Sequence, residues 1–325
     1  MGAEDKKLRR TLMSLNIAQI GTGRVGRPTA YSILCAGLAS NLMVCDTKPG
    51  LAEAFAEELR HVSASLRLDV EITGYERDEE VSGADIILIS AGKPRTPGLK
   101  MSRRDLSVHN AETIRYISEA TRSHNPGAKY VVITNPVDSM AMICKKYSKA
   151  DFVISTGTNI ESLRFRSRLA KSLEVPVSKV QGWAGGEHGS AAVILWSTAK
   201  AYGISADEYA RIEAKLFDKG SIETYMKSVS KFVVDNIGGT EFGPAASFRD
   251  IIRAIGNNTD EVLSVATPME IDGIPEPVWV GVPTRLGYSL GPSLINSLSE
   301  DERGAIKEAA KAIYKTYKTA LEAIE

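Results

Sequence analysis

A glycine-rich turn follows directly on a short apolar run near the start of the chain. Residues 15–20 are mostly apolar, and residues 21–26 read Gly-Thr-Gly-Arg-Val-Gly. Residues 28–37 are small or apolar, as expected of a helix packed on a sheet, and residues 42–45 form a second apolar run that ends at Asp46. This order predicts a strand, a tight turn, a helix and a second strand, which together form one βαβ unit.

The context of the glycine motif makes it informative. With 27 glycines in 325 residues, three glycines at this spacing should arise by chance about 0.2 times in such a chain. Here the motif follows a predicted strand, opens a predicted helix and lies 20 residues before Asp46, as in dinucleotide-binding sites. The main chain can then approach a pyrophosphate at a helix N-terminus. We expect the cofactor contacts to come from Gly21, Thr22, Gly23, Arg24, Val25, Gly26 and Asp46.

The charge of Asp46 bears on the choice of cofactor. Its carboxylate would accept hydrogen bonds from the adenosine ribose and repel a 2′-phosphate, which favours NAD over NADP. The neighbouring Lys48 would partly offset that repulsion. NAD is therefore the expected cofactor, and NADP is disfavoured.

Strands and helices continue to alternate through the first half of the chain. We expect helices at residues 52–65, 104–123 and 138–147, and strands at 70–73, 86–89, 130–134 and 152–155. This alternation predicts an α/β fold with a doubly wound parallel sheet. We divide the chain into a charged N-terminal tail (1–14), a dinucleotide-binding domain (15–157) and a substrate domain (158–325).

Composition excludes several classes of partner. Forty basic residues balance forty acidic ones, so no bulk charge attracts nucleic acid or an anionic membrane. The three cysteines have no close Cys or His neighbours, which argues against a disulfide framework and a metal site. Residues 1–14 are charged and lack the apolar core of a signal peptide. We therefore expect a cytoplasmic protein.

One of the four histidines lies among glycines, in the stretch Trp183-Ala184-Gly185-Gly186-Glu187-His188-Gly189-Ser190. A lone histidine is more often structural, but this setting suggests the acid and base of an enzyme. Two further segments follow predicted strands, where ligands bind in open α/β sheets: residues 92–106, with two prolines and five cations, and residues 134–138, which read Thr-Asn-Pro-Val-Asp. Each segment also has a non-functional interpretation. Residues 92–106 would then be a solvated surface loop, and residues 134–138 an ordinary Asn-Pro turn.

Together these segments resemble the lactate/malate dehydrogenase family from about residue 15 to the C-terminus. The resemblance is carried by six motifs in matching order: residues 21–26, Pro94-Arg95 through Ser102-Arg103, Thr134-Asn135-Pro136, Glu161-Ser162-Leu163-Arg164, Gly186-Glu187-His188-Gly189 and Val280-Gly281-Val282-Pro283. It implies hydride transfer between a 2-hydroxy acid and NAD. It also implies a Rossmann domain followed by a mixed α+β substrate domain, assembled as a homodimer or homotetramer.

The resemblance also assigns roles to individual residues. His188 would exchange a proton with the substrate oxygen, and Glu161 would orient it. Arg164 would bind the substrate carboxylate as a two-point fork, and Arg103 would polarise the carbonyl. Asn135 would contact the reacting oxygen, and Thr240 would line the substrate pocket. Asn110, Ile133 and Asn135 would also contact the cofactor.

The resemblance makes Arg95 the residue that selects the substrate. Malate enzymes of the family carry arginine at this position, whereas lactate enzymes usually carry glutamine. An arginine buried by loop closure needs an anion, and malate and oxaloacetate supply a second carboxylate. The resemblance thus favours a small dicarboxylate. A lactate or broader 2-hydroxy acid dehydrogenase, and a nucleotide-binding protein without catalysis, remain as alternatives.

Two departures from the family pattern concern geometry. Glu161 stands where the family usually has the shorter aspartate, so the main chain or the histidine must shift. The loop also contains two extra residues, Leu99 and Lys100, and the assignment of Arg103 rather than Arg104 rests on the following Asp-Leu. In the remaining chain we expect residues 205–237 to be helical, with Ser205 and Glu208 at the spacing of a capping box. We also expect antiparallel strands at 262–269 and 277–282, and a final helix capped by Ser299 and Glu302.

Overall fold

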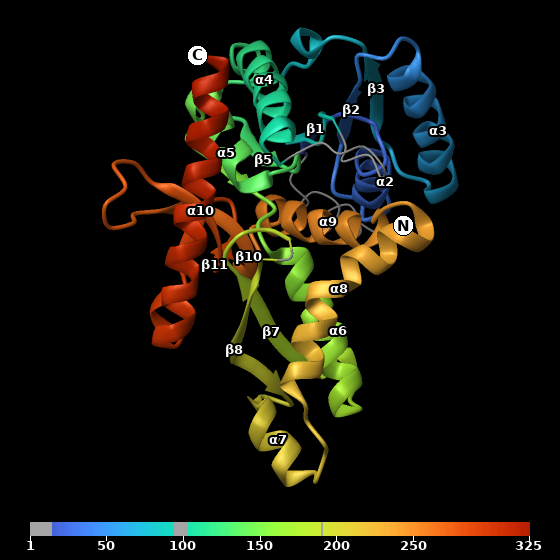
Figure 1. The fold of residues 1–325 in the computed structure, drawn as a ribbon. Helices are drawn as coiled ribbons and strands as arrows, with labels where there is room; N and C mark the ends of the chain where they lie inside the picture. Colours follow the sequence, from blue (N-terminus) through green and yellow to red (C-terminus); the bar gives the residue numbers. More distant parts are fainter. Residues whose placement is uncertain (1–14, 94–102, 190) are drawn as a thin grey trace.

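The computed structural model describes residues 15–93, 103–189 and 191–325. Its first half alternates strands and helices as expected (Figure 1): β1 (Asn16–Ile20), α2 (Gly26–Cys35), β2 (Asn41–Cys45), α3 (Leu51–Leu66), β3 (Glu71–Tyr75), β4 (Ile86–Ile89), α4 (Arg103–Arg122), β5 (Lys129–Val132), α5 (Val137–Ser148) and β6 (Val153–Ser155). These six strands pair in parallel in the order β3-β2-β1-β4-β5-β6. The predicted doubly wound sheet is confirmed.

Alternate residues of the central strands face opposite layers of helices. Ile87 and Ile89 of β4 pack with residues of α4 and α5, whereas Ile86 and Leu88 pack with residues of α2 and α3. Because both faces are covered, β4 can be apolar at every position. Its complete burial explains the unbroken apolar run in the sequence.

The second half contains α6 (Asn159–Leu173), β7 (Val180–Gly185), β8 (Val193–Ala201), β9 (Ile204–Ser205), α7 (Ala206–Ile212), α8 (Lys219–Ile237), α9 (Phe242–Gly256), β10 (Glu261–Met269), β11 (Val278–Leu286), β12 (Leu290–Ser293) and α10 (Glu300–Ile324). Strands β10 to β12 are antiparallel and extend the first sheet, because β10 pairs with β6 through Ala266 and Ser155. Strands β7, β8 and β9 form a separate sheet, which lies with α6, α7 and α8 in the lower lobe of Figure 1.

The stretch 205–237, expected to be helical, consists of two helices with a break between them. Helix α7 ends at Ile212, Ala214 takes a positive φ of 48°, and Asp218 starts α8 by accepting a hydrogen bond from Ser221 N. An alanine in the left-handed region stops the first helix, and the aspartate caps the second. Ser205 caps α7 by accepting a hydrogen bond from Glu208 N at 3.2 Å, which is the serine half of the expected capping box.

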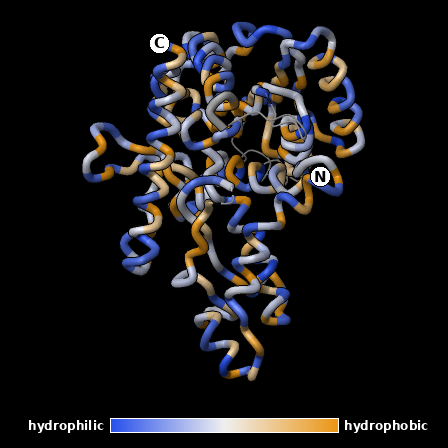
Figure 2. The backbone as a smooth tube through the Cα atoms, viewed as in Figure 1, coloured by the Kyte–Doolittle hydropathy of each residue, from blue (hydrophilic) through white to orange (hydrophobic). Residues whose placement is uncertain are grey.

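The long C-terminal helix α10 closes the fold along one side of the molecule (Figure 1). Ser299 and Glu302 form the predicted capping box at its start. Its apolar residues alternate with polar ones along the tube in Figure 2, and Ile306, Ile313 and Tyr317 are buried. Among the described residues, none of the helices combines the length and apolarity needed to span a bilayer.

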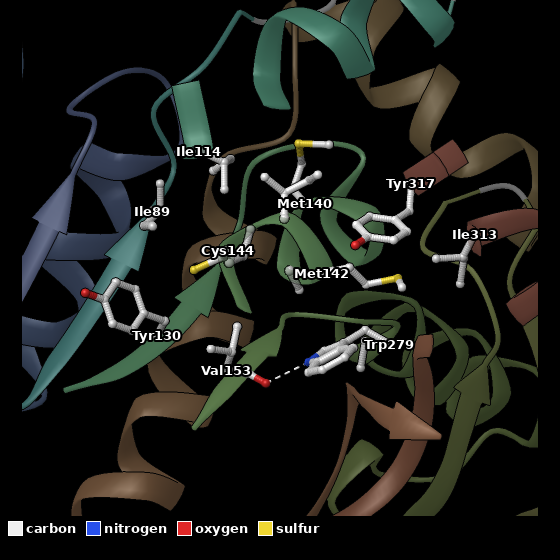
Figure 3. Packing of buried hydrophobic residues seen from close by; sticks show 14 of the residues in the cluster. Ile89, Ile114, Tyr130, Met140, Met142, Cys144, Val153, Trp279, Ile313 and Tyr317 are labelled. Atoms are coloured by element: carbon white, nitrogen blue, oxygen red, sulfur yellow. Dashed lines mark hydrogen bonds between the residues drawn. The ribbon is translucent and has the colours of Figure 1, made fainter. Parts of the chain in front are cut away.

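A dense apolar core fixes the two elements that carry much of the site. In Figure 3, Met140, Met142 and Cys144 of α5 pack among β4, β5 and α10, and Trp279 of β11 donates a hydrogen bond to Val153 O of β6 at 2.7 Å. Helix α5 and strand β6 therefore have little freedom to move, since interiors of this kind are close-packed.

Candidate functional site

The glycine turn between β1 and α2 has the shape of an anion cradle. Gly21 has φ +91°, and a Cβ on Gly26 would lie 1.9 Å from Gly21 O, so neither position accepts a side chain. A Cβ on Gly23 would meet no atom within 4 Å, so this part of the turn faces open space. Helix α2 begins at Gly26, and its N-terminus attracts negative charge. The turn thus suits the pyrophosphate of a dinucleotide.

Asp46 lies directly beside this turn, at the end of β2. Its Oδ2 accepts hydrogen bonds from Thr22 N and Thr22 Oγ1, both at 2.9 Å, and its Oδ1 accepts from Lys48 N at 3.1 Å. The carboxylate is therefore held in place next to the glycines. This position matches that of the acidic residue that binds the adenosine ribose in such folds.

Arg24 connects the glycine turn to the segment that contains Thr240. Its Nη1 lies 2.7 Å from Glu241 Oε1, and its side chain packs on Gly239, where a Cβ would come within 2.8 Å of Arg24 Cδ. Thr240 is half-buried between these two contacts, just before α9. The predicted cofactor turn and the predicted substrate segment therefore lie side by side.

The ends of β4 and β5 are joined by Asn110 of α4. Its side-chain oxygen accepts from Lys93 N at 2.8 Å, and its amide nitrogen donates to Asn135 O at 2.7 Å. Asn110 is buried and thus braces two main-chain segments of the site. Asn135 precedes a cis peptide bond to Pro136 and has an exposed side chain, while Ile133 is buried beside it.

His188 follows β7 and is oriented by two acceptors. Its Nδ1 lies 3.2 Å from Gly157 O and 3.3 Å from Glu161 Oε2. Neither a carbonyl nor an ionised carboxylate can donate, so the neutral imidazole carries its proton on Nδ1. Its Nε2 then has a free lone pair, which can accept a proton from a substrate.

The close approach of β7 to β11 places His188. Gly186 and Gly281 exchange main-chain hydrogen bonds of 2.8 and 3.0 Å, and a Cβ on Gly281 would come within 2.7 Å of Thr158 Oγ1. Gly186 has φ +83°, so this contact explains the glycine at positions 186 and 281, each in one of the six sequence motifs. It fixes the strand end from which the histidine projects.

Glu161 and Arg164 share one face of α6, and Glu161 also contacts His188. Glu161 Oε1 lies 3.4 Å from Arg164 Nη1, and the carboxylate is almost completely buried. The longer glutamate thus reaches the imidazole, and Nδ1 is shared with a main-chain carbonyl. Arg164 retains 15% side-chain exposure, which leaves guanidinium donors available at the site.

The pKa values of this pair follow from its geometry. Burial alone would lower the pKa of His188, but the Glu161 carboxylate and, more weakly, the Asp138 carboxylate raise it to about 9. Burial would raise the pKa of Glu161, but His188 and Arg164 bring it below its ordinary value. At neutral pH the two groups form an ion pair.

Two of the expected substrate contacts cannot be placed. Arg95 lies outside the described residues, and so does the side chain of Arg103, whose main chain begins α4. Their roles stay predictions. In the sequence, Arg95 follows β4 and Arg103 is the first residue of α4.

Sequence reasoning assigned no role to four residues that contact the site. Asp138, Ser155 and Gly157 hydrogen-bond to one another or to His188, and Glu241 pairs with Arg24. Asp138 belongs to the Thr-Asn-Pro-Val-Asp segment and could have been singled out as an acidic residue at a strand end. The other three carry no local sequence signal.

Comparison with known proteins covers nearly the whole chain. Residues 15–152 match the lactate/malate dehydrogenase NAD-binding domain, and residues 158–324 match the alpha/beta C-terminal domain of the same proteins. The chain is 41% identical over 309 residues to a malate dehydrogenase of Sulfurisphaera tokodaii (95% of this chain, 97% of the relative) and 38% identical over 311 residues to that of Sulfolobus acidocaldarius (96% and 98%). A solved minor L-lactate dehydrogenase of Enterococcus mundtii superposes with a TM-score of 0.87 at 26% identity, covering 94% of this chain and 98% of that one.

Proposed function

The chain belongs to the lactate/malate dehydrogenase family, and on that premise we propose that it interconverts malate and oxaloacetate with NAD(H). The observation that carries the proposal is the contact of His188 Nδ1 with Glu161, while Arg164 pairs with the same carboxylate. A proton-transfer group and a carboxylate-binding group thus lie on either side of one buried anion. This arrangement suits a substrate that carries both a carboxylate and a reacting oxygen.

The cofactor would be held by the glycine turn and Asp46. The cradle fits, because Gly21 and Gly26 exclude side chains and Gly23 leaves the turn open. NAD(H), when bound, accepts or supplies the hydride. We propose NAD rather than NADP because the Asp46 carboxylate beside the turn would repel a 2′-phosphate.

His188 would carry the proton that accompanies the hydride. During reduction its Nε2–H would donate to the ketone oxygen, and during oxidation the free Nε2 would take the hydroxyl proton. Glu161 would stabilise the imidazolium and hold the tautomer. Arg164 would bind the carboxylate next to the reacting carbon, Asn135 would hydrogen-bond near the oxygen, and Thr240 would line the pocket.

Arg95 and Arg103 would complete the site from the segment that follows β4. Arg103 would polarise the substrate carbonyl as negative charge develops on its oxygen. Arg95 would pair with the second carboxylate of a dicarboxylate, which pyruvate lacks. The relatives at 41% and 38% identity are named malate dehydrogenases, which agrees with this reading.

A first prediction concerns substrate and cofactor choice. We expect NADH oxidation with a kcat/KM for oxaloacetate at least about a hundredfold above that for pyruvate, because an unpaired buried arginine costs several kcal/mol. Parallel assays with NADPH should give a lower kcat/KM than those with NADH. A higher kcat/KM for pyruvate would favour a lactate or broader 2-hydroxy acid dehydrogenase. Absence of turnover with every 2-keto acid would favour a binding protein without catalysis.

A second prediction concerns pH. Because the pKa of His188 is raised to about 9, the imidazolium needed for reduction persists at neutral pH and is lost as the pH rises through that value. The neutral imidazole needed for oxidation appears over the same range. We therefore expect kcat/KM for oxaloacetate to fall, and kcat/KM for malate to rise, around an inflection near pH 9. Inflections at the ordinary imidazole pKa of about 6.5 would contradict the ion pair with Glu161.

A further inference from the structure

Asp138 is a buried carboxylate behind His188 that the mechanism so far does not use. It lies in the first turn of α5 and is 2% exposed. Its Oδ2 accepts a hydrogen bond from His188 N at 3.0 Å, and its Oδ1 accepts one from Ser155 Oγ at 2.7 Å. Burying a carboxylate costs free energy unless hydrogen bonds compensate it. The presence of Asp138 at this buried position, with these two donors, therefore needs a physical explanation.

These contacts form part of a closed ring of hydrogen bonds. Ser155 Oγ donates to Asp138 and accepts from Gly157 N at 3.0 Å. Gly157 O in turn lies 3.2 Å from His188 Nδ1, and His188 N donates back to Asp138. The ring therefore fixes both the main chain of the histidine and one of the two acceptors that set its tautomer.

The ring is attached to rigid parts of the fold. Asp138 is on α5 and Ser155 is on β6, the two elements that the core in Figure 3 locks together. Gly157 has φ +48°, and a Cβ there would lie 2.5 Å from Ala266 N of β10. The main chain at Gly157 thus packs directly against β10, and only glycine fits there.

The charge of Asp138 also acts on the imidazole. Burial raises the pKa of Asp138 to about 6, and the hydrogen bonds from His188 N and Ser155 oppose that rise. The carboxylate is therefore ionised when His188 titrates near pH 9. The other charged groups that act on the two residues are Glu187, beside His188 in the chain, and Glu161 and Arg164 on α6.

We infer that Asp138 is a positioning residue for His188: it holds the main chain of the histidine directly and, through Ser155, the Gly157 carbonyl that accepts the Nδ1 proton. A merely structural aspartate would contribute to folding alone. A positioning aspartate changes how the histidine holds its proton. The inference rests on the proposed function only in naming His188 as the group that transfers the proton.

The kinetic test uses Asp138→Asn and Ser155→Ala in the full chain. Asparagine keeps the size of the side chain and an acceptor for His188 N but removes the charge. We expect kcat to fall about tenfold, as small displacements of a catalytic group do, with the NADH dissociation constant unchanged. The inflection of kcat/KM should move to lower pH. Ser155→Ala keeps the carboxylate, so kcat should fall while the inflection stays near that of the wild type.

A matched control separates these effects from loss of stability. Thr121→Val removes a buried hydroxyl of α4 that bonds to Tyr130 and Ile117 O, away from His188. It should lower Tm without moving the pH profile. If Asp138→Asn behaves like this control, with a lower Tm and an unchanged inflection, the inference is overturned. If Asp138→Asn does not fold, an unchanged kcat in Ser155→Ala overturns it instead.

Nuclear magnetic resonance gives a readout that needs no activity. The chain has four histidines, so the ring signals of labelled protein can be titrated individually. In the wild type, the nitrogen shifts of neutral His188 should report a proton on Nδ1. In Asp138→Asn only the His188 titration should move to lower pH. The same titration curve in wild type and variant would refute the role of Asp138, even if the wild type turns over no 2-keto acid.

Discussion

Replacing Glu161 with glutamine is expected to lower kcat about a thousandfold, while the dissociation constant of NADH stays the same. The amide cannot stabilise the imidazolium, so the pKa of His188 falls and less of the proton donor is present at neutral pH. Glutamine can also turn its amide donor toward Nδ1, which favours the wrong tautomer. Arg164 loses its partner in the same step.

Two variants test whether the expected loss of kcat comes from the charge and the length of the Glu161 side chain. Glu161→Asp restores the carboxylate one methylene shorter and should recover much of the lost turnover. Glu302→Gln neutralises another buried glutamate, which hydrogen-bonds to Ser197 and Ser299 at the start of α10; it should reduce stability and leave kcat near the wild-type value. Steady-state kinetics and NADH fluorescence titration measure both quantities. Full turnover in Glu161→Gln would remove this residue from the mechanism.

The parallel sheet could be predicted because its signals are local. The apolar run at residues 86–89 and the glycine turn before Gly26 each report a strand or a turn within a few residues, and the βαβ rules then limit how they connect. The extension of this sheet by β10 could not be predicted. It depends on the pairing of Ala266 with Ser155, two residues far apart in sequence, and periodicity does not encode such pairing.

The site residues likewise fall into those that local motifs identify and those that only long-range contacts reveal. His188 and Glu161 could be named from motifs, although 27 residues separate them. The contact of His188 with Asp138 could not, because it is made through the main-chain nitrogen of His188, which every residue but proline offers. The pairing of Arg24 with Glu241 could not be predicted either, since two charged residues 217 positions apart in the sequence look like separate solvated surface residues.

Arg95→Gln is expected to change which substrate the enzyme prefers. In this variant the closed site would bury the second carboxylate of oxaloacetate without a cationic partner, at a cost of several kcal/mol. The same site would no longer bury an unpaired arginine when pyruvate binds. Both effects act in one direction, so the ratio of kcat/KM for oxaloacetate to kcat/KM for pyruvate should fall by about a hundredfold or more.

The control for this prediction lies in the same segment of the chain. Lys100→Gln removes a positive charge five positions from Arg95, so it reports the general attraction of a basic loop for an anionic substrate. That attraction depends on ionic strength and is screened by salt, whereas a buried ion pair is screened much less. We expect Lys100→Gln to leave the substrate ratio nearly unchanged at 0.15 M salt and Arg95→Gln to reduce it at every salt concentration. Equal changes in the two variants, or a ratio that Arg95→Gln does not alter, would mean that Arg95 does not select the dicarboxylate.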